Sequence, residues 1–341
     1  MNEKKSTTQF PYVLVTGSTG FLGFRIVKIL MLKGFKVRAF VRKTSNIDKL
    51  KTLGVELCVG NIADIVSLKP AFKGVDYVVH AAADTVGSVE GGRVNTISGT
   101  ENVLALCKEY KVKKFVYISS CSVYGVADFK KGYVVTEESS LEREPEARGT
   151  YSNTKFQAEK VVLKAMAEDV CPIVCLRPGT IFGPGGGFYT PMMGFSFRRK
   201  MFLTIGDGHL VLPLVYVDNV ADAVGVVLNK EESDGKIYNL IDQYQLSKKQ
   251  YIERLIKKIY PKAMFLYFPY SLLYLIVFFM EIFFKLIGRP SFLTRYRLES
   301  SQKKIVYDSK RICRELDFTS PVSMDVALKN IIEYEMQKNA S

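Results

Sequence analysis

The sequence lacks the residue patterns of a metal-binding protein. Its 6 cysteines occur without a CxxC pair, and only His80 and His209 are available to join them. Structural metal sites need closely spaced thiolate or imidazole ligands, so we predict no metal site. Cys171 and Cys175 stand four residues apart in an apolar run, which is typical of reduced core thiols.

A secretory signal is also lacking. Residues 1–9 are polar and are expected to form a disordered tail, and no apolar run of signal-peptide length accompanies them. With reduced cysteines, this predicts a cytoplasmic protein.

Acidic residues are scarce relative to basic ones, with 34 Asp and Glu against 48 Lys and Arg and a net charge of +14. This balance favours phosphorylated cofactors or an acidic membrane surface. The basic residues are dispersed and carry no aromatic-interleaved or zinc-finger motif, so we predict no nucleic-acid partner.

What the chain does have is a regular alternation of short β-rich runs and longer helical patterns. Apolar strands alternating with helices predict an α/β fold with a doubly wound parallel sheet of the Rossmann type. The length of 341 residues suits about two structural units. The expected strands are 12–16, 36–41, 56–59, 77–81, 114–119, 173–176, 211–217 and 236–240. The expected helices are 21–33, 99–110, 151–168 and 218–228.

We expect two regions after a tail over residues 1–9. An NADP-binding Rossmann domain is predicted over residues 10–180 and 205–245. A smaller, mostly helical substrate and membrane-contact region is predicted over residues 181–204 and 246–341.

A glycine-rich turn follows the first expected strand. The sequence TGSTGFLG opens the next helix, and glycines there allow a tight turn and close approach of the backbone to a pyrophosphate. The strand–turn–helix context predicts a dinucleotide site, with mere turn glycines as the alternative. The residues expected to line this site are Gly17, Thr19, Gly20, Phe21, Leu22 and Gly23.

The second expected strand is followed by no carboxylate before Asp48. An acidic residue after this strand bonds the ribose of NAD, whereas a basic residue accommodates the 2′-phosphate of NADP. Arg42 and Lys43 occupy the region, and a guanidinium suits a phosphate. We predict NADP(H) as the preferred cofactor, with NAD(H) still usable; solvated surface charges are the alternative role of this pair.

Tyr151 and Lys155 form a YxxxK pattern at the start of an expected helix. A spacing of four places both on one helix face. A nearby ammonium favours the phenolate form of a tyrosine, which predicts that Tyr151 is a general acid or base; the alternative is simple packing of a tyrosine on a lysine. The segment FVYISSCSVYG ends an earlier strand, and we expect Ser120 and Ser122 on one face of it, at the sheet edge where such folds bind ligands.

Together these motifs resemble the extended short-chain dehydrogenases/reductases, the NAD-dependent epimerase/dehydratase superfamily, over residues 11–245. The resemblance implies that Ser120 bonds the reacting oxygen, Tyr151 is the acid/base and Lys155 also holds the nicotinamide ribose. It implies that Asn95 supports the lysine through water. Further cofactor contacts are implied for Asn61, Ile62, Ala81, Ala82, Ala83, Pro178 and Thr180.

Asn61 and His80 need separate interpretation. Asn61 stands where the family has a carboxylate, so an amide oxygen would accept the bond from the adenine amino group. His80, directly before the alanines, is interpreted as a positioning or core histidine rather than a base.

The segment GDGHLVLPLVYVDNVAD lacks the arginine with which many nucleotide-sugar enzymes of this family bind a phosphate; Leu212 stands in its place. An apolar LVLPL predicts an apolar substrate pocket. The C-terminal FPYSLLYLIVFFMEIFFKLIGRPSFLTRYR resembles the 3β-hydroxysteroid dehydrogenase-like branch, which implies sterol, hopanoid or long-chain lipid substrates. Arg42 instead resembles the dihydroflavonol-reductase-like members.

Residues 270–287 are expected to form one very apolar helix, about 27 Å long at 1.5 Å per residue. We expect its polar stripe to face the protein while its broad apolar face enters one membrane leaflet, making the protein peripheral. Alternatives are a core helix, a homodimer interface and a true span. The stripe consists of Ser271, Tyr274, Glu281 and Lys285.

The leading hypothesis is therefore an NADP(H)-dependent oxidoreductase that transfers hydride to or from a secondary alcohol or ketone of a hydrophobic substrate. One alternative is a nucleotide-sugar epimerase or dehydratase that retains its cofactor. The other is a non-catalytic NADP-sensing protein, against which the Ser120, Tyr151 and Lys155 set argues.

Overall fold

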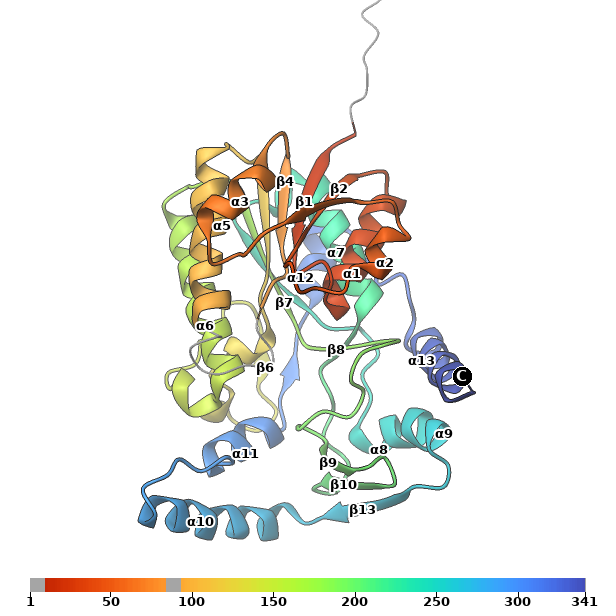
Figure 1. Cartoon of the computed structure of the whole chain (residues 1–341). Helices are drawn as coiled ribbons and strands as arrows, with labels where there is room; N and C mark the ends of the chain where they lie inside the picture. The colour runs from red at the N-terminus through yellow and green to blue at the C-terminus, as the bar shows by residue number, and fades with distance from the viewer. Residues whose placement is uncertain (1–9, 84–92, 341) are drawn as a thin grey trace, which may run out of the picture. The chain divides into compact units, whose positions relative to one another are not determined.

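The computed structural model describes residues 10–83 and 93–340, so the tail predicted over residues 1–9 lies outside the described part. Its main sheet has seven strands in the order β12-β7-β5-β4-β1-β2-β3 (Figure 1). These are β1 (Tyr12–Thr16), β2 (Lys36–Val41), β3 (Glu56–Val59), β4 (Tyr77–His80), β5 (Lys114–Ile118), β7 (Ile173–Pro178) and β12 (Lys236–Leu240). Strand β1 pairs in parallel with β2 and β4, β2 with β3, and β4 with β5. The predicted α/β fold with a doubly wound parallel sheet is confirmed.

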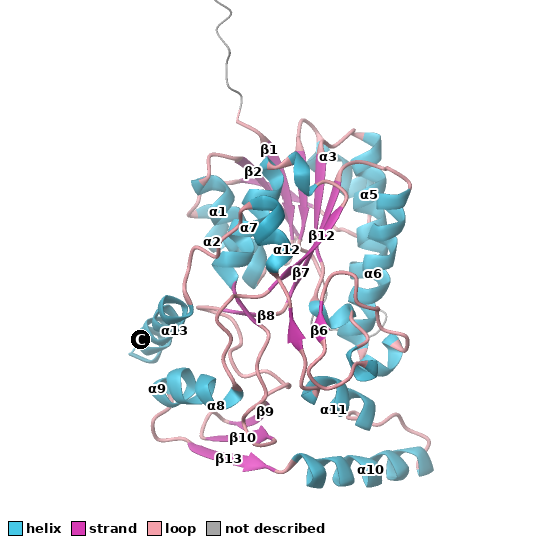
Figure 2. Ribbon diagram, turned by 180° about the vertical axis from the view of Figure 1, so that it is seen from behind, coloured by secondary structure: helices cyan, strands magenta, loops and turns pink. Residues whose placement is uncertain are grey.

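Helices alternate with these strands, as Figure 2 shows. They are α1 (Phe21–Leu32), α2 (Asp48–Lys51), α3 (Ile65–Phe72), α5 (Gly99–Glu109), α6 (Thr150–Ala167) and α7 (Val217–Asn229). Helix α1 packs on β1 and β2, while α5 packs on β4 and on α3. Because the strands are covered by helices, they are almost wholly apolar, with every residue of β1 and β5 buried.

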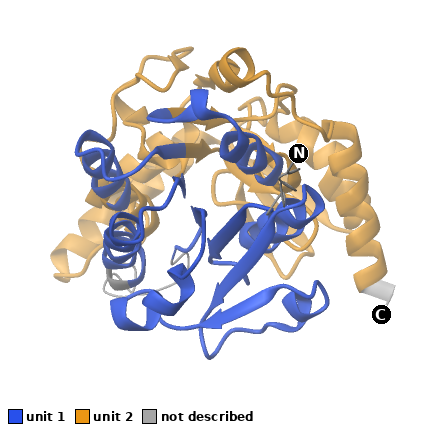
Figure 3. Ribbon diagram, turned by 90° about the horizontal axis from the view of Figure 1, so that it is seen from above, with its two compact units in different colours: residues 1–118, 158–175, 221–236 blue, residues 119–157, 176–220, 237–341 orange. Residues whose placement is uncertain are grey.

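The chain divides into two compact units (Figure 3). Unit 1 comprises residues 1–118, 158–175 and 221–236, and unit 2 comprises residues 119–157, 176–220 and 237–341. Within unit 1, the buried Lys114 at the start of β5 pairs with Asp234 at 2.7 Å and donates to the carbonyl oxygens of Val227 at 2.9 Å and Lys230 at 2.8 Å. This buried cation fixes the segment after α7 to the sheet.

Unit 2 holds further small sheets and helices that complete the chain. The strands are β6 (Val134–Val135), β8 (Thr180–Phe182), β9 (Gly194–Phe197), β10 (Met201–Ile205), β11 (Leu214–Tyr216), β13 (Met264–Phe268) and β14 (Val306–Tyr307). They pair as β13-β10-β9, β11-β8 and β14-β6. The helices are α8 (Lys248–Tyr251), α9 (Lys257–Ile259), α10 (Tyr270–Leu286), α11 (Arg295–Gln302), α12 (Lys310–Leu316) and α13 (Met324–Ala340).

The strand expected over residues 211–217 is wrong in extent. Only β11 forms, and it pairs with β8 rather than with the main sheet. Pro213 precedes it and has no N–H to donate to a strand ladder, so pairing begins only after it. Val211 makes an isolated antiparallel bridge to Ser247.

Two glycines in unit 1 stand where no side chain fits. Gly17 has φ +71°, and a Cβ there would lie 2.7 Å from the backbone nitrogen of Ala82. A Cβ at Gly23 would lie 2.0 Å from the carbonyl oxygen of Gly17. The close packing of the first turn of α1 onto the end of β1 therefore depends on the absence of both side chains.

We predict that Gly23→Ala lowers the free energy of unfolding by about 3 kcal/mol, because a methyl group at 2.0 Å from backbone forces α1 away from β1. Chemical denaturation measures this loss. Gly187→Ala is the control, since no atom lies within 4 Å of a Cβ there, and its stability is expected to match the parent. Equal stability of the two variants would contradict the packing argument.

Candidate functional site

The turn between β1 and α1 presents backbone donors. Gly20 N–H donates to Gly17 O at 3.0 Å, and the Ser18 hydroxyl donates to Phe40 O at 2.9 Å, which fixes the turn against β2. The first N–H groups of α1 have no intrahelical acceptor, and no side chain caps this helix. Backbone donors at a helix N-terminus with no Cβ in front of them fit the pyrophosphate of a nicotinamide dinucleotide.

The predicted contacts to the adenosine end lie on neighbouring loops of unit 1. Arg42 and Lys43 directly follow β2 and are exposed, and a short turn holds the backbone of Arg42 through Ser45 N–H at 2.9 Å. The side-chain oxygen of Asn61 accepts from Ala63 N–H at 3.1 Å. This amide oxygen, assigned from the sequence to the adenine, is thus already used within its own turn.

His80 ends β4 and is fully buried between two hydroxyls. Its Nδ1 lies 2.7 Å from Thr16 Oγ1, and its Nε2 lies 3.0 Å from Thr100 Oγ1. The prediction of a positioning or core histidine is confirmed. It anchors the strand end from which Ala81, Ala82 and Ala83 continue, and Ala81 N–H donates to Thr16 O at 3.3 Å.

Asn95 and Ile62 lie on either side of the start of α5. Asn95 belongs to a π-helical turn, Arg93–Ser98, a local widening that is frequent at functional sites. A Cβ at Gly99 would lie 3.0 Å from Ile62 Cγ2, so the buried Ile62 packs directly on this helix.

The serine segment begins where β5 ends. Ser119 N–H donates to Leu176 O at 2.7 Å, and Ser120 caps a 3₁₀ turn, Cys121–Val123, by accepting from Ser122 N–H at 3.1 Å. The expectation that Ser122 shares a strand face with Ser120 is wrong, because the strand stops at Ile118 and the chain coils. The buried Ser122 hydroxyl has no hydrogen-bond partner in the described residues.

Tyr151 and Lys155 lie one turn apart in the first part of α6. Lys155 is 4% exposed, whereas Tyr151 is 39% exposed, and the Tyr151 hydroxyl is hydrogen-bonded to the Ser120 side chain. Burial of the hydroxyl raises the pKa of Tyr151, although the bond to Ser120 acts in the opposite direction. The sequence suggested a phenolate favoured by the ammonium. Desolvation is the larger influence, so the hydroxyl holds its proton at neutral pH.

A buried network of unit 2, which the sequence analysis missed, supports the serine segment. Arg177 on β7 is 2% exposed and donates to the Tyr124 hydroxyl at 2.8 Å; this hydroxyl in turn donates to Asn239 Oδ1 at 2.6 Å. The thiol of Cys121 donates to Arg177 O at 3.2 Å. An arginine directly after the apolar run over residues 173–176 was the sequence signal for this network.

The backbone near Pro178 and Thr180 is tightly fixed. Gly179 N–H donates to Leu240 O at 3.1 Å, and Thr180 N–H donates to Pro213 O at 2.7 Å. A Cβ at Gly179 would lie 2.3 Å from Pro213 O. The two predicted nicotinamide contacts therefore flank a point where two backbones of unit 2 touch.

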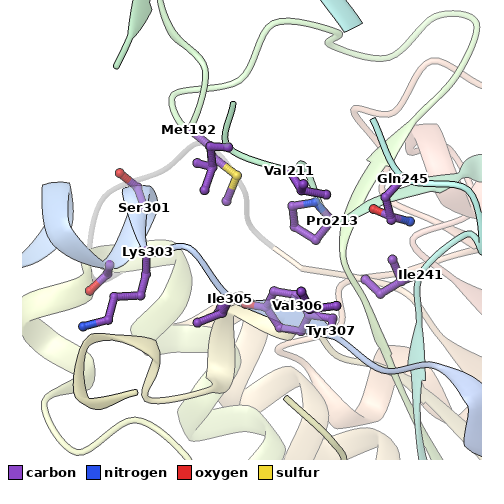
Figure 4. A pocket seen from close by; sticks show the side chains of 12 residues that line it. Met192, Val211, Pro213, Ile241, Gln245, Ser301, Lys303, Ile305, Val306 and Tyr307 are labelled. Atoms are coloured by element: carbon purple, nitrogen blue, oxygen red, sulfur yellow. The ribbon is translucent and has the colours of Figure 1, made fainter. Parts of the chain in front are cut away.

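Unit 2 encloses a cavity of about 40 Å³ (Figure 4). Most of its wall is apolar; among the described residues Gln245, Ser300, Ser301 and Lys303 contribute polar side chains, and Tyr307 adds a ring with a hydroxyl. The apolar lining residues are Met192, Leu210, Val211, Pro213, Ile241, Ile305, Val306 and Tyr307.

The cavity adjoins the serine segment. Its lining residues Ile241, Ile305 and Tyr307 belong to one hydrophobic cluster with Cys121, the residue after Ser120. The Cys121 thiol is close enough to both Tyr307 and Tyr151 to raise their pKa values, a smaller influence than burial in each case. Three residues of the cavity wall thus pack in the same cluster as Cys121, the residue that follows Ser120.

The thiols form no metal centre in the described residues, where no three His, Cys, Asp or Glu side chains cluster as ligands. All 6 cysteines are free thiols. Burial raises the pKa of Cys107, which is hydrogen-bonded to Cys171. Cys175 instead lies 3.7 Å from a carboxylate oxygen of Glu159.

Comparison with known proteins agrees with this arrangement. The model of the "NAD dependent epimerase/dehydratase family" matches residues 13–240. A 4-hydroxy-2-methyl-3-oxo-4-farnesyl-3,4-dihydroquinoline-1-oxide ketoreductase of Stigmatella aurantiaca is 30% identical over 247 residues, covering 71% of this chain and 72% of the relative. The human sterol-4-alpha-carboxylate 3-dehydrogenase, decarboxylating, is 30% identical over 280 residues, covering 79% of this chain and 72% of the relative.

Among solved structures, the crystal structure of gox2253 is similar with a TM-score of 0.79 and 26% identity, covering 96% of this chain and 98% of that chain. The family model covers both the glycine turn and the YxxxK helix, and relatives include a ketoreductase and a sterol dehydrogenase. The chain therefore belongs to the NAD dependent epimerase/dehydratase family, the extended short-chain dehydrogenases/reductases, and is an enzyme of that family.

Proposed function

We propose that this enzyme is an NADP(H)-dependent oxidoreductase acting on a secondary alcohol or ketone of a hydrophobic substrate. The observation that carries the proposal is the Ser120–Tyr151 hydrogen bond next to an apolar cavity. A bound nicotinamide dinucleotide would supply the hydride donor or acceptor. The glycine turn, with its backbone donors, would bind the pyrophosphate.

Tyr151 has the protonation state that ketone reduction requires. The protonated hydroxyl would give its proton to an oxygen that gains charge. Burial raises its pKa and so weakens it as an acid, and a cation near the hydroxyl would offset this effect. Ser120, whose hydroxyl already bonds Tyr151, would stabilise the same oxygen with a hydrogen bond. Lys155, buried one turn along α6, is assigned to bind the ribose and to stabilise the phenolate that Tyr151 becomes when it gives up its proton.

The substrate class is proposed from the cavity wall and supported by the relatives. Leu212 is buried between the lining residues Val211 and Pro213 in the sequence, and no arginine is among the described residues that line the cavity. A diphosphate would find no guanidinium there, which disfavours the alternative of a nucleotide-sugar epimerase. Net oxidation of NADPH with a lipid ketone supports a reductase, while tightly retained cofactor without net change supports an epimerase.

We predict that Tyr151→Phe lowers turnover about 100-fold or more, because the reaction loses its proton donor. Cofactor affinity and melting temperature are expected to stay near the parent values, which separates a chemical role from a structural one. Tyr244→Phe is the control, since Tyr244 is an exposed tyrosine outside the site. A parallel loss of NADPH affinity in Tyr151→Phe would show that the tyrosine acts by binding.

The cofactor preference is tested separately at Arg42. We predict that Arg42→Ala weakens NADPH binding about tenfold or more and leaves NADH binding unchanged, because a 2′-phosphate loses a charge-assisted hydrogen bond. Titration of cofactor fluorescence measures both affinities. Arg143→Ala removes the same charge from an exposed site in unit 2 and is expected to change neither. An unaltered NADPH to NADH ratio in Arg42→Ala would refute the assignment.

We further propose that α10 attaches the protein to the surface of a membrane. In the described residues no helix is long and apolar enough to cross a bilayer. Helix α10 is apolar and largely uncovered: only Val277 is buried, whereas Phe279 is 60% exposed and Leu286 is 80% exposed. A face of this kind fits insertion into one leaflet.

The side of α10 that faces the protein differs from the expected polar stripe. Tyr274 packs against a small buried cluster that includes Val277. Glu281 accepts a hydrogen bond from the side chain of Arg295 at 2.6 Å. Ser271 and Lys285, however, are exposed. The helix is held by an apolar contact and one ion pair rather than by its polar residues alone.

Positive charge lies at both ends of the exposed apolar surface of unit 2. Arg198, Arg199 and Lys200 form the exposed turn from β9 to β10, and β10 is paired with β13, which leads into α10. Lys285 and Arg289 lie at the other end of the helix and are exposed. Such charges would meet anionic headgroups.

We predict that replacing Leu272, Ile276 and Phe279 together by glutamine abolishes binding to vesicles of anionic phospholipid while NADPH binding is retained. All three side chains are exposed, so their replacement costs little in the folded protein but places polar groups in the leaflet. Sedimentation with vesicles measures the effect.

The control carries the same three-glutamine change at Leu32, Val66 and Val326, which are exposed on α1, α3 and α13. It is expected to bind vesicles like the parent. Loss of folding or of NADPH binding in the α10 variant alone would show that the helix belongs to the core, and equal vesicle binding of all forms would contradict membrane attachment.

A further inference from the structure

The cavity of unit 2 contains a buried hydroxyl for which the proposed function has no use so far. Ser300 lines the cavity, is 6% exposed, and its Oγ has no hydrogen-bond partner in the described part of the chain. A buried hydroxyl without a partner loses its bonds to water and gains none in return. It therefore costs stability unless something in the cavity bonds to it.

Helix α11 holds Ser300 in this position from both of its ends. At the N-terminal end the Tyr296 hydroxyl donates to Glu142 Oε1 at 2.5 Å. At the C-terminal end the Gln302 amide donates to Met192 O at 2.9 Å, on the opposite part of the cavity wall. With both ends fixed, the helix cannot rotate to bring the Ser300 hydroxyl to solvent.

The neighbouring Ser301 lines the same cavity, but its hydroxyl has hydrogen-bond partners. Its hydroxyl donates to Leu298 O at 2.9 Å and accepts from the Gln302 amide at 3.0 Å. The Ser301 hydroxyl makes its hydrogen bonds within α11, whereas the Ser300 hydroxyl can still form one with a ligand.

The charge of the lining indicates which ligand group fits. Lys303 lines the cavity, and its ammonium donates to Ala127 O at 2.8 Å, one of its three donor positions. No Asp or Glu is among the described residues that line the cavity. Figure 4 shows Ser301 and Lys303 together at one end and Ile241 and Gln245 at the other.

We propose that Ser300 is a specificity-determining residue that donates a hydrogen bond to a carboxylate on an otherwise apolar substrate. The Lys303 ammonium balances the charge of that carboxylate, and the apolar wall takes the hydrocarbon. The inference rests on the proposed function, to which it adds that the hydrophobic alcohol or ketone is an acid. A single lysine matches a single carboxylate, which distinguishes this group from a diphosphate.

The test uses a panel of long-chain hydroxy fatty acids that differ in the spacing between hydroxyl and carboxyl, each paired with its methyl ester, in the presence of NADP⁺. For the acids that are oxidised, Ser300→Ala is expected to raise KM about tenfold or more with little change in kcat. KM for the esters is expected to stay the same. Lys303→Met is expected to act in the same direction, and Ser301→Ala to leave the acid-to-ester ratio unchanged.

Thermal unfolding supplies a readout that does not depend on turnover. Without ligand, Ser300→Ala is expected to melt at or above the parent temperature, because the lost hydroxyl has no partner. Decanoate is expected to raise the melting temperature of the parent and of Ser301→Ala but not of Ser300→Ala, while methyl decanoate shifts all three alike.

Two results would overturn the inference. One is an equal change in KM for acids and esters, and the other is a melting temperature of Ser300→Ala below the parent value with an undiminished decanoate shift. If no acid, ester or ketone is turned over, the proposed function fails, and the decanoate shifts alone still decide whether Ser300 binds a carboxylate.

Discussion

Backbone packing at the turn from β1 to α1 is the constraint on which the start of α1 in unit 1, the proposed pyrophosphate site, depends. The carbonyl oxygen of Gly17 occupies the space that a side chain at Gly23 would need, and Ala82 occupies the space in front of Gly17. The first turn of α1 therefore lies directly on the end of the strand, and its N–H groups stay uncovered. His80, bonded on both ring nitrogens, fixes the adjacent strand end at which the three alanines begin.

In unit 2 the chain near Ser120 is held in place by buried polar groups rather than by close packing of small residues. Arg177, Tyr124 and Asn239 satisfy one another inside a core, which offsets the cost of removing a guanidinium from water. The same network holds the thiol of Cys121, and through it the turn that carries Ser120. The turn that carries Ser120 is thus held by buried hydrogen bonds. Replacing one partner would leave the other partner's polar group buried without a hydrogen bond.

Local patterns made the fold predictable, and they also supplied the proposed site residues. The glycine turn, the YxxxK spacing and the alternation of strands and helices act within a few residues, so the sequence displays them directly. The Ser122 position and the strand over residues 211–217 were mispredicted because β5 ends at Ile118 and β11 begins only after Pro213. Ser300 could not be found from sequence, since a hydroxyl without a partner is defined only by its surroundings in three dimensions.

The points at which the chain passes between the two units have a consequence for how such enzymes can be recombined. Four of these crossings fall inside continuous elements, at 157/158 in α6, 175/176 in β7, 220/221 in α7 and 236/237 in β12. A chimaera that grafts the counterpart of unit 2 from a relative onto unit 1 of this chain would therefore have to be spliced within helices and strands. Successful grafts will need matched residues on both sides of each splice, which ties the choice of substrate to the sequence of the Rossmann scaffold.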